Sequence, residues 1–137
     1  MLRSMGKSPR PTDAELAVLR VLWRRGPSTV REVHDEMADT RAVGYTTTLK
    51  TLQVMTEKGL TQREEHRGQH LYRPRHSEED TQRRLVGDLL DRAFGGSTSK
   101  LVVQALASRR ATPDELREIK RLLAAAEAGA RKGRGDD

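Results

Sequence analysis

The apolar residues in the first sixty positions recur with the 3.6-residue period of an α-helix. This period predicts helices that begin at Thr12 and at Thr29, and a third helix over residues 44–58. Gly26-Pro27 ends the first helix, and Gly59 is a natural C-cap for the third. The inward positions of the first two helices are Leu16, Leu19, Leu22, Trp23, Val30, Val33 and Met37.

Helix starts are also marked by the capping-box spacing, in which a hydroxyl residue precedes a carboxylate residue by three positions. The pairs are Thr12–Glu15, Thr29–Glu32, Ser77–Asp80 and Thr112–Glu115. The three pairs with glutamate fit the motif strictly, and the pair with aspartate is a weaker form. Pro113 strengthens the last start, because proline at the first helical position sacrifices no hydrogen bond.

After Gly59 the helical period stops. Residues 60–66 and 70–73 flank Arg67-Gly68-Gln69, and two short segments around a glycine-containing turn predict a β-hairpin. Few of these residues are apolar, so the position of the segment directly after the third helix carries much of this interpretation.

Beyond Pro74-Arg75-His76, which we interpret as a hinge, the helical period returns in three segments, the first of which ends at Gly95-Gly96. Their apolar stripes are wide, and three thin helices bury little surface alone, so we expect these stripes to join two copies of the chain. A core face within one chain is the alternative. The residues assigned to dimerisation are Leu85, Leu89, Leu90, Phe94, Leu101, Leu106, Leu116, Ile119 and Leu123.

Together these elements predict a mainly α fold with a small β-hairpin, namely a winged helix-turn-helix followed by a helical dimerisation region. We expect a flexible arm over residues 1–11, the winged helix over 12–76 and the dimerisation region over 77–128. Residues 129–137 are rich in glycine and charge, which predicts a disordered tail.

Composition narrows the class of protein. Hydrophobic residues make up 34% of the chain and aromatic residues 3%, so the core is lean and dimerisation would add buried surface. There is no cysteine for a disulfide or a thiolate site, and no apolar run long enough to span a membrane. The first residues have no apolar signal-peptide core, and we expect a cytoplasmic protein.

The net charge of +6 is concentrated in the N-terminal half, where residues 1–76 hold 14 Lys and Arg against 9 Asp and Glu. A local basic surplus favours an acidic partner such as nucleic acid. In the third helix Tyr45, Thr48, Leu49, Leu52 and Met55 share one face, while Thr46, Thr47, Lys50 and Val54 share the other. The second face suits contacts with phosphates and base edges in the major groove.

We therefore predict binding of double-stranded DNA through the second and third helices and the hairpin. The assigned residues are Thr29, Arg31, Tyr45, Thr46, Thr47, Lys50, Arg63, Arg67 and Arg73. A solvated helix face would show the same residue types, and winged helices also serve as protein–protein adaptors. A nonspecific DNA-binding protein is a third alternative.

The sequence does not favour catalysis or a cofactor. Two of the four histidines, His66 and His70, flank the turn and could face one another, but two ring nitrogens without a third ligand make a poor zinc site. The paired carboxylates Asp35-Glu36 and Glu64-Glu65 suggest solvated faces. No nucleophile elbow and no phosphate-binding loop is found. We expect no enzymatic activity, no cofactor and no metal.

Residues 44–53 (GYTTTLKTLQ) together with residues 57–60 (EKGL) resemble the penicillinase-repressor family. Further matches are Glu15-Leu16 through Leu22-Trp23, Val30-Arg31-Glu32-Val33, Gly68 followed by Tyr72-Arg73-Pro74, and the run from Leu89 to Ser97 (LLDRAFGGS). The resemblance covers about Thr12 to Leu123, and the order and spacing of the matches make it specific.

This resemblance implies a homodimer that binds a palindromic operator and blocks transcription, in some members of genes for β-lactam resistance or a related stress response. It also implies, as a partner, a membrane sensor protease or its downstream effector that triggers cleavage of the repressor. The family's Asn-Phe cleavage bond falls at Gln104-Ala105 here, so the residues of that bond differ. Other members respond to copper through cysteines, a switch that a chain without cysteine excludes.

Overall fold

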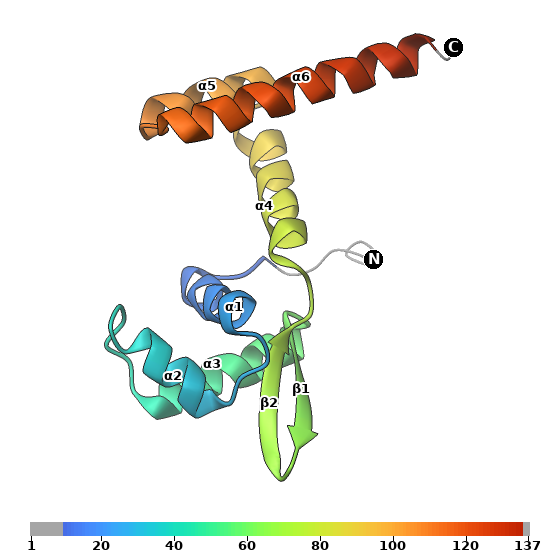
Figure 1. Ribbon diagram of the computed structural model, residues 1–137. Helices are drawn as coiled ribbons and strands as arrows, with labels where there is room; N and C mark the ends of the chain where they lie inside the picture. The colour runs from blue at the N-terminus through green and yellow to red at the C-terminus, as the bar shows by residue number, and fades with distance from the viewer. Residues whose placement is uncertain (1–9, 136–137) are drawn as a thin grey trace. The chain divides into compact units, whose positions relative to one another are not determined.

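In the computed structural model, which describes residues 10–135, three helices are followed by a hairpin and three further helices (Figure 1). In order the elements are α1 (Asp13–Arg25), α2 (Val30–Met37), α3 (Tyr45–Lys58), β1 (Thr61–His66), β2 (Gln69–Pro74), α4 (Glu78–Ala93), α5 (Thr98–Ser108) and α6 (Pro113–Gly135). The predicted fold class, mainly α with three helices before a two-stranded hairpin, is confirmed. Most of the predicted N-terminal arm and the last two residues lie outside the described residues.

Local chemistry explains where the helices start. At α1 the Glu15 N–H donates to Thr12 Oγ1 at 3.1 Å, and the Thr12 N–H donates to Glu15 Oε1 at 2.9 Å. The same reciprocal pair begins α2 at Thr29 and α6 at Thr112. At Ser77 the Asp80 N–H donates to the serine Oγ at 3.0 Å. This half of the motif uses the backbone of residue 80, so it does not depend on the length of the aspartate side chain. An additional cap, which the sequence analysis missed, is Ser97 at α5.

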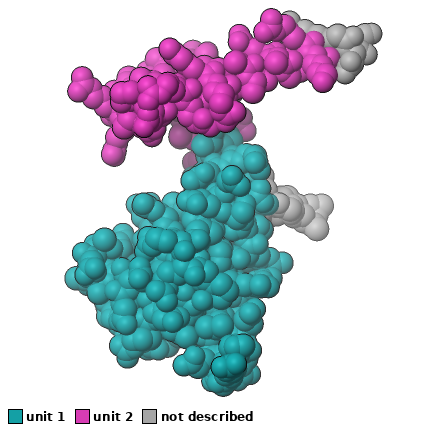
Figure 2. Space-filling model, in the orientation of Figure 1, with its two compact units in different colours: residues 1–88 teal, residues 89–137 magenta. Residues whose placement is uncertain are grey.

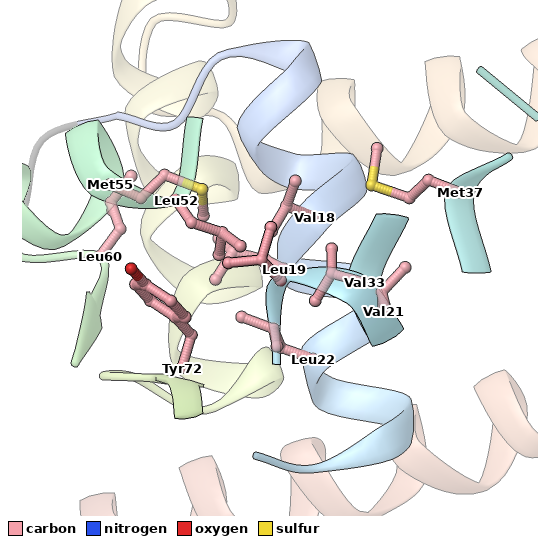
Figure 3. Close-up of a cluster of buried hydrophobic side chains, with 11 residues drawn as sticks. Val18, Leu19, Val21, Leu22, Val33, Met37, Leu52, Met55, Leu60 and Tyr72 are labelled. Atoms are coloured by element: carbon pink, nitrogen blue, oxygen red, sulfur yellow. The ribbon is translucent and has the colours of Figure 1, made fainter. Parts of the chain in front are cut away.

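One hydrophobic core joins α1, α2, α3 and the hairpin (Figure 3). Leu22, Val33, Leu52 and Met55 are fully buried in it, as the helical stripes predict. Trp23 packs against the core and its Nε1 donates to the carbonyl of His76 at 3.0 Å. The complete set of buried apolar residues is Val18, Leu19, Val21, Leu22, Val30, Val33, Met37, Leu52, Met55, Leu60 and Tyr72.

The hairpin is antiparallel and tighter than the sequence suggests. His66 pairs with Gln69, so the turn consists of Arg67 and Gly68 alone and not of three residues. Both turn residues have positive φ, 53° and 80°, which is the conformation of a type I′ turn and matches the twist of the strands. At the other end Ser28 pairs with Tyr72 through two backbone hydrogen bonds of 2.8 and 3.0 Å, which fixes the hairpin to the segment between α1 and α2.

The segment interpreted as a hinge is anchored. The Arg75 N–H donates to the Leu60 carbonyl at 3.0 Å, and the His76 carbonyl accepts from Trp23. Burial lowers the pKa of His76, and the nearby charges of Arg84 and Arg75 lower it further, so its imidazole is neutral at pH 7. The backbone between β2 and α4 is therefore tied to the core at two points.

The chain divides into two compact units, residues 1–88 and 89–137 (Figure 2). The sequence predicts a boundary at His76 instead, because the linker there contains proline. In the structure the first part of α4 belongs to the first unit, where Leu85 lines a groove with Leu16 and Trp23. No helix within the described residues is long and apolar enough to cross a membrane.

The second unit differs from expectation at its end, because α6 continues to Gly135 where the sequence predicts a disordered tail from Gly129. Residues 124–132 are rich in alanine and end in Arg131 and Lys132, which are strong helix formers. Each glycine within the helix costs about 1 kcal/mol, and the segment has no proline to end it.

Candidate nucleic-acid interface

Helix α3 is held by its inner face. Thr48, Leu52 and Met55 are buried there, and the Thr48 hydroxyl lies 3.4 Å from the Gly44 carbonyl and 3.5 Å from His34 Nδ1. The helix ends at Gly59, whose φ of +83° is the left-handed conformation that glycine adopts without strain. The inner face predicted from the sequence is confirmed except at Tyr45.

The helical wheel places Tyr45 on the same face as Thr48, although the sequence analysis assigns Tyr45 to DNA binding; unlike the buried Thr48, it has 39% of its surface exposed. It is the first residue of α3, so no preceding turn encloses it, and its ring packs at the edge of α2 against Arg31 and His34. The physical reason for the difference is that a helical wheel treats every position as if the helix continued on both sides.

The outer face of α3 carries Thr46, Thr47 and Lys50, all exposed as predicted, whereas Val54 is half-buried. Gln53 is also exposed, three positions after Lys50, and the sequence analysis did not assign it. This i, i+3 spacing places it on the same face, and was the signal that could have identified it. The face thus offers hydroxyl, ammonium and amide groups, which donate to and accept from base edges and phosphates.

The three hairpin arginines are not brought to one surface. Cross-strand partners share a face, and Arg63 pairs with the buried Tyr72 while Arg73 pairs with Gln62, so Arg63 and Arg73 lie on opposite faces of the hairpin. Arg73 is also engaged, with its Nε 3.3 Å from Gln62 Oε1 and 3.7 Å from Glu64 Oε2. Arg67 lies at the turn, away from both pairs.

The same register corrects the expectation for the histidines. His66 pairs with Gln69, and His70 pairs with Glu65, so the two imidazoles lie on opposite faces and do not face one another. In residues 10–135 no three His, Asp or Glu side chains gather in an arrangement that could hold a metal ion.

Thr29, which was assigned to DNA binding, is half-buried, and its hydroxyl accepts the Glu32 N–H as the cap of α2.

An ion pair between the half-buried Lys58 and the buried Glu15 fixes the C-terminal end of α3 to the start of α1. Lys58 Nζ lies 2.7 and 3.0 Å from the two carboxylate oxygens of Glu15, which is only 4% exposed. Burial opposes ionisation of Glu15, but the hydrogen bonds from Lys58 and from the Thr12 N–H outweigh it and hold its pKa below the usual value. The outer face of α3 is therefore oriented at both ends of the helix.

We expect Glu15→Gln to lower the free energy of unfolding by about 1–3 kcal/mol at neutral pH, because it removes charge-assisted hydrogen bonds. The folded-state pKa of Glu15 lies below the value of the unfolded chain, so its contribution is present above about pH 4.5 and is lost as the pH falls through the folded pKa. Thermal unfolding from pH 7 to pH 3 should show a smaller acid loss in the variant. Parallel curves for the two proteins would contradict this assignment.

The residues assigned to dimerisation fall into two groups. Leu89, Leu106, Leu116 and Leu123 are exposed, whereas Leu85, Leu90, Phe94, Leu101 and Ile119 are half-buried. Further exposed apolar residues that the sequence analysis did not assign are Val86, Val102, Val103 and Leu122. None of the described residues of α4, α5 and α6 is buried.

Comparison with known proteins gives consistent matches over most of the chain. The family model described as "Penicillinase repressor" matches residues 11–125. The transcriptional regulator BlaI of Mycobacterium tuberculosis, in strains CDC 1551 and H37Rv, is 35% identical over 127 residues, or 91% of each chain. The penicillinase repressor of Bacillus licheniformis is 25% identical over 119 residues, or 87% of this chain and 93% of its own length.

A solved structure, that of the monomeric form of Bacillus licheniformis BlaI in complex with the blaP half-operator, also matches. It is 28% identical, with a TM-score of 0.49, and the match covers 54% of this chain and 90% of that one.

Proposed function

The chain belongs to the penicillinase-repressor family, and on that premise we propose that it is a transcriptional repressor that binds double-stranded operator DNA as a homodimer. The family consists of repressors and not of enzymes.

The observation that carries the proposal is the outer face of α3. Thr46, Thr47, Lys50 and Gln53 form an exposed polar strip on a helix whose opposite face is buried in the core. A helix presented in this way, with a hairpin directly after it, has the dimensions and chemistry to enter a major groove while the hairpin meets the flanking backbone. The basic surplus of residues 1–76 would draw the same surface toward phosphates.

The direct test is to recover the DNA that co-purifies with the full chain and to sequence it. An enriched palindrome, bound more tightly than random duplex in the same salt, would support an operator-binding repressor. Equal binding to all sequences would indicate a nonspecific DNA-binding protein. Failure to retain any duplex at low salt would favour the protein–protein adaptor and contradict the proposal.

On the enriched DNA we expect Lys50→Ala, and separately Thr47→Ala, to weaken binding by about 1–3 kcal/mol, because each removes a side chain placed to contact a base edge. Binding to random duplex should fall much less. Lys120→Ala, which removes an exposed lysine from α6, is the matched control and should leave both affinities unchanged. Fluorescence anisotropy titrations decide the outcome. Equal losses on both DNAs would reassign Lys50 to a phosphate contact.

The homodimer is proposed from the exposed apolar side chains of α4 to α6. Val103, Leu122 and Leu123 are 59%, 50% and 56% exposed, and none of the described side chains of these three helices is fully buried. Helices that bury no side chain of their own gain stability by covering such residues. A second copy of the chain presents the same apolar stripes, so the two surfaces can cover one another in a symmetric dimer.

Release from DNA is proposed to follow from loss of the dimer. The bond that aligns with the family's cleavage point, Gln104-Ala105, lies within α5 and both residues are exposed. Its residues differ from the expected Asn-Phe pair, so a sensor protease acting on this chain would need a different sequence preference or a different bond. Incubating the chain with such a protease and mapping the products by mass spectrometry would identify that bond.

A further inference from the structure

Arg31 and Tyr45 come from different helices and meet beside the outer face of α3. Arg31 Cζ lies 4.8 Å from the centroid of the Tyr45 ring, well inside the range of a cation–π contact. Arg31 is exposed on α2, and Tyr45 is the first residue of α3. A cation–π contact with the ring leaves the N–H donors of the guanidinium able to hydrogen-bond to a ligand.

Other arginines of the first unit are held in a different way, by carboxylates. Arg24 and Arg25 pair with Glu36, and Arg73 lies near Glu64. In the part of the chain that the structure describes, no carboxylate lies within ion-pair distance of Arg31. An aromatic ring orders a guanidinium without neutralising its charge, so Arg31 is an ordered, uncompensated cation on the surface, and an anion is the ligand that it favours.

Tyr45 is itself fixed by the same two helices. The His34 and Tyr45 rings meet edge to face, with centroids 5.9 Å apart and planes inclined by 75°. His34 Nδ1 lies 3.5 Å from the hydroxyl of Thr48, which is buried on the inner face of α3. These contacts therefore connect the buried side of α3, through His34 and Tyr45, to Arg31.

We infer that Tyr45 is a positioning residue, which holds the Arg31 guanidinium for a contact with a backbone phosphate of the DNA bound by α3. This inference rests on the proposed function and assigns a role within it. A guanidinium fork matches the geometry of phosphate oxygens, and a side chain ordered before binding loses less conformational freedom when it binds. Tyr45, which the sequence analysis assigned to DNA directly, acts through Arg31 instead.

The test uses the full chain and a random-sequence duplex of about 30 base pairs, because a phosphate contact does not depend on sequence. We expect Arg31→Ala to weaken binding and to reduce the slope of log affinity against log salt by about one. Tyr45→Leu should weaken binding about 2–5-fold, the range of a surface cation–π contact, while Tyr45→Phe retains the ring and binds like the unsubstituted chain. Arg110→Ala, at an exposed arginine between α5 and α6, is the matched control.

The decisive comparison is a double-mutant cycle. If Tyr45 acts through Arg31, Tyr45→Leu has no further effect once Arg31→Ala is present. An undiminished effect in that background, or a loss in Tyr45→Phe equal to that in Tyr45→Leu, overturns the inference and leaves DNA binding intact. Absence of any binding by the unsubstituted chain overturns the proposed function itself.

A second variant guards against a folding defect in Tyr45→Leu, which thermal unfolding would reveal. Arg31→Lys keeps the charge but lacks the planar group that stacks on the ring. We expect it to retain the salt slope and to lose affinity as Tyr45→Leu does. Unchanged affinity in Arg31→Lys would overturn the inference, because charge alone would then account for the contribution of Arg31.

Discussion

We expect the full chain carrying Leu116→Glu and Leu123→Glu to be a monomer that binds its palindromic operator about 10²–10⁴-fold more weakly than the unsubstituted chain. Both leucines are exposed on α6, so charges there need not disturb the core of α1, α2 and α3, but they would be buried and unpaired between two copies. Two joined reading modules make the second DNA contact intramolecular, and a monomer loses that gain.

Light scattering gives the oligomeric state, and anisotropy at equal concentrations of chain gives the affinity. Ala128→Glu is the matched control, because Ala128 is exposed on the side of α6 that carries Arg117 and Arg121. It should remain dimeric. If the double variant is also dimeric, the interface lies elsewhere in the chain. If it is monomeric and yet binds the operator as tightly as the unsubstituted chain, dimer dissociation is not the route to release.

We expect Leu52→Ala to lower the free energy of unfolding by about 2–5 kcal/mol, a large share of the total for a small domain. Leu52 is 0% exposed and belongs to the core that α3 forms with α1, α2 and the hairpin, so its truncation leaves a cavity in that core. Because dimerisation would add to the measured stability, urea unfolding should be followed at one fixed chain concentration.

Leu49→Ala is the matched comparison, since Leu49 lies on the same helix and is half-buried. Both substitutions change helix propensity equally, so the difference between them reports packing alone. We expect Leu49→Ala to cost less than half as much as Leu52→Ala. Equal losses would mean that Leu52 is packed no more tightly than the half-buried Leu49.

The features that the sequence predicts are those decided by nearest neighbours along the chain. Thr12 and Glu15 are three residues apart, and their reciprocal hydrogen bonds fix the start of α1 without contacts from other parts of the chain. Gly59 ends α3 because its left-handed conformation is intrinsic to glycine. The outer face of α3 follows from the helical period, which is why Thr46, Thr47 and Lys50 were assigned correctly as exposed.

The features that the sequence analysis missed depend on residues far apart in the chain. Lys58 and Glu15 lie 43 positions apart, and nothing local to either residue predicts their ion pair. The stack of Arg31 on Tyr45 depends on how α2 packs on α3. The roles of the hairpin arginines depended on whether the turn has two or three residues, because a shift of one position moves every side chain to the opposite face.

The pairing of Ser28 with Tyr72 fixes the open end of the hairpin, which we call its base. The turn at the other end, the tip, is exposed. Thr61 and Tyr72 are buried at the base, whereas residues 62–70 are exposed throughout. Local opening free energies therefore rise from tip to base, and the backbone amides of Ser28 and Tyr72 exchange with solvent only when the core itself opens. In a DNA complex the tip could follow a groove of varying width while the base keeps its register, so adaptation to the ligand would not draw on the stability of the fold.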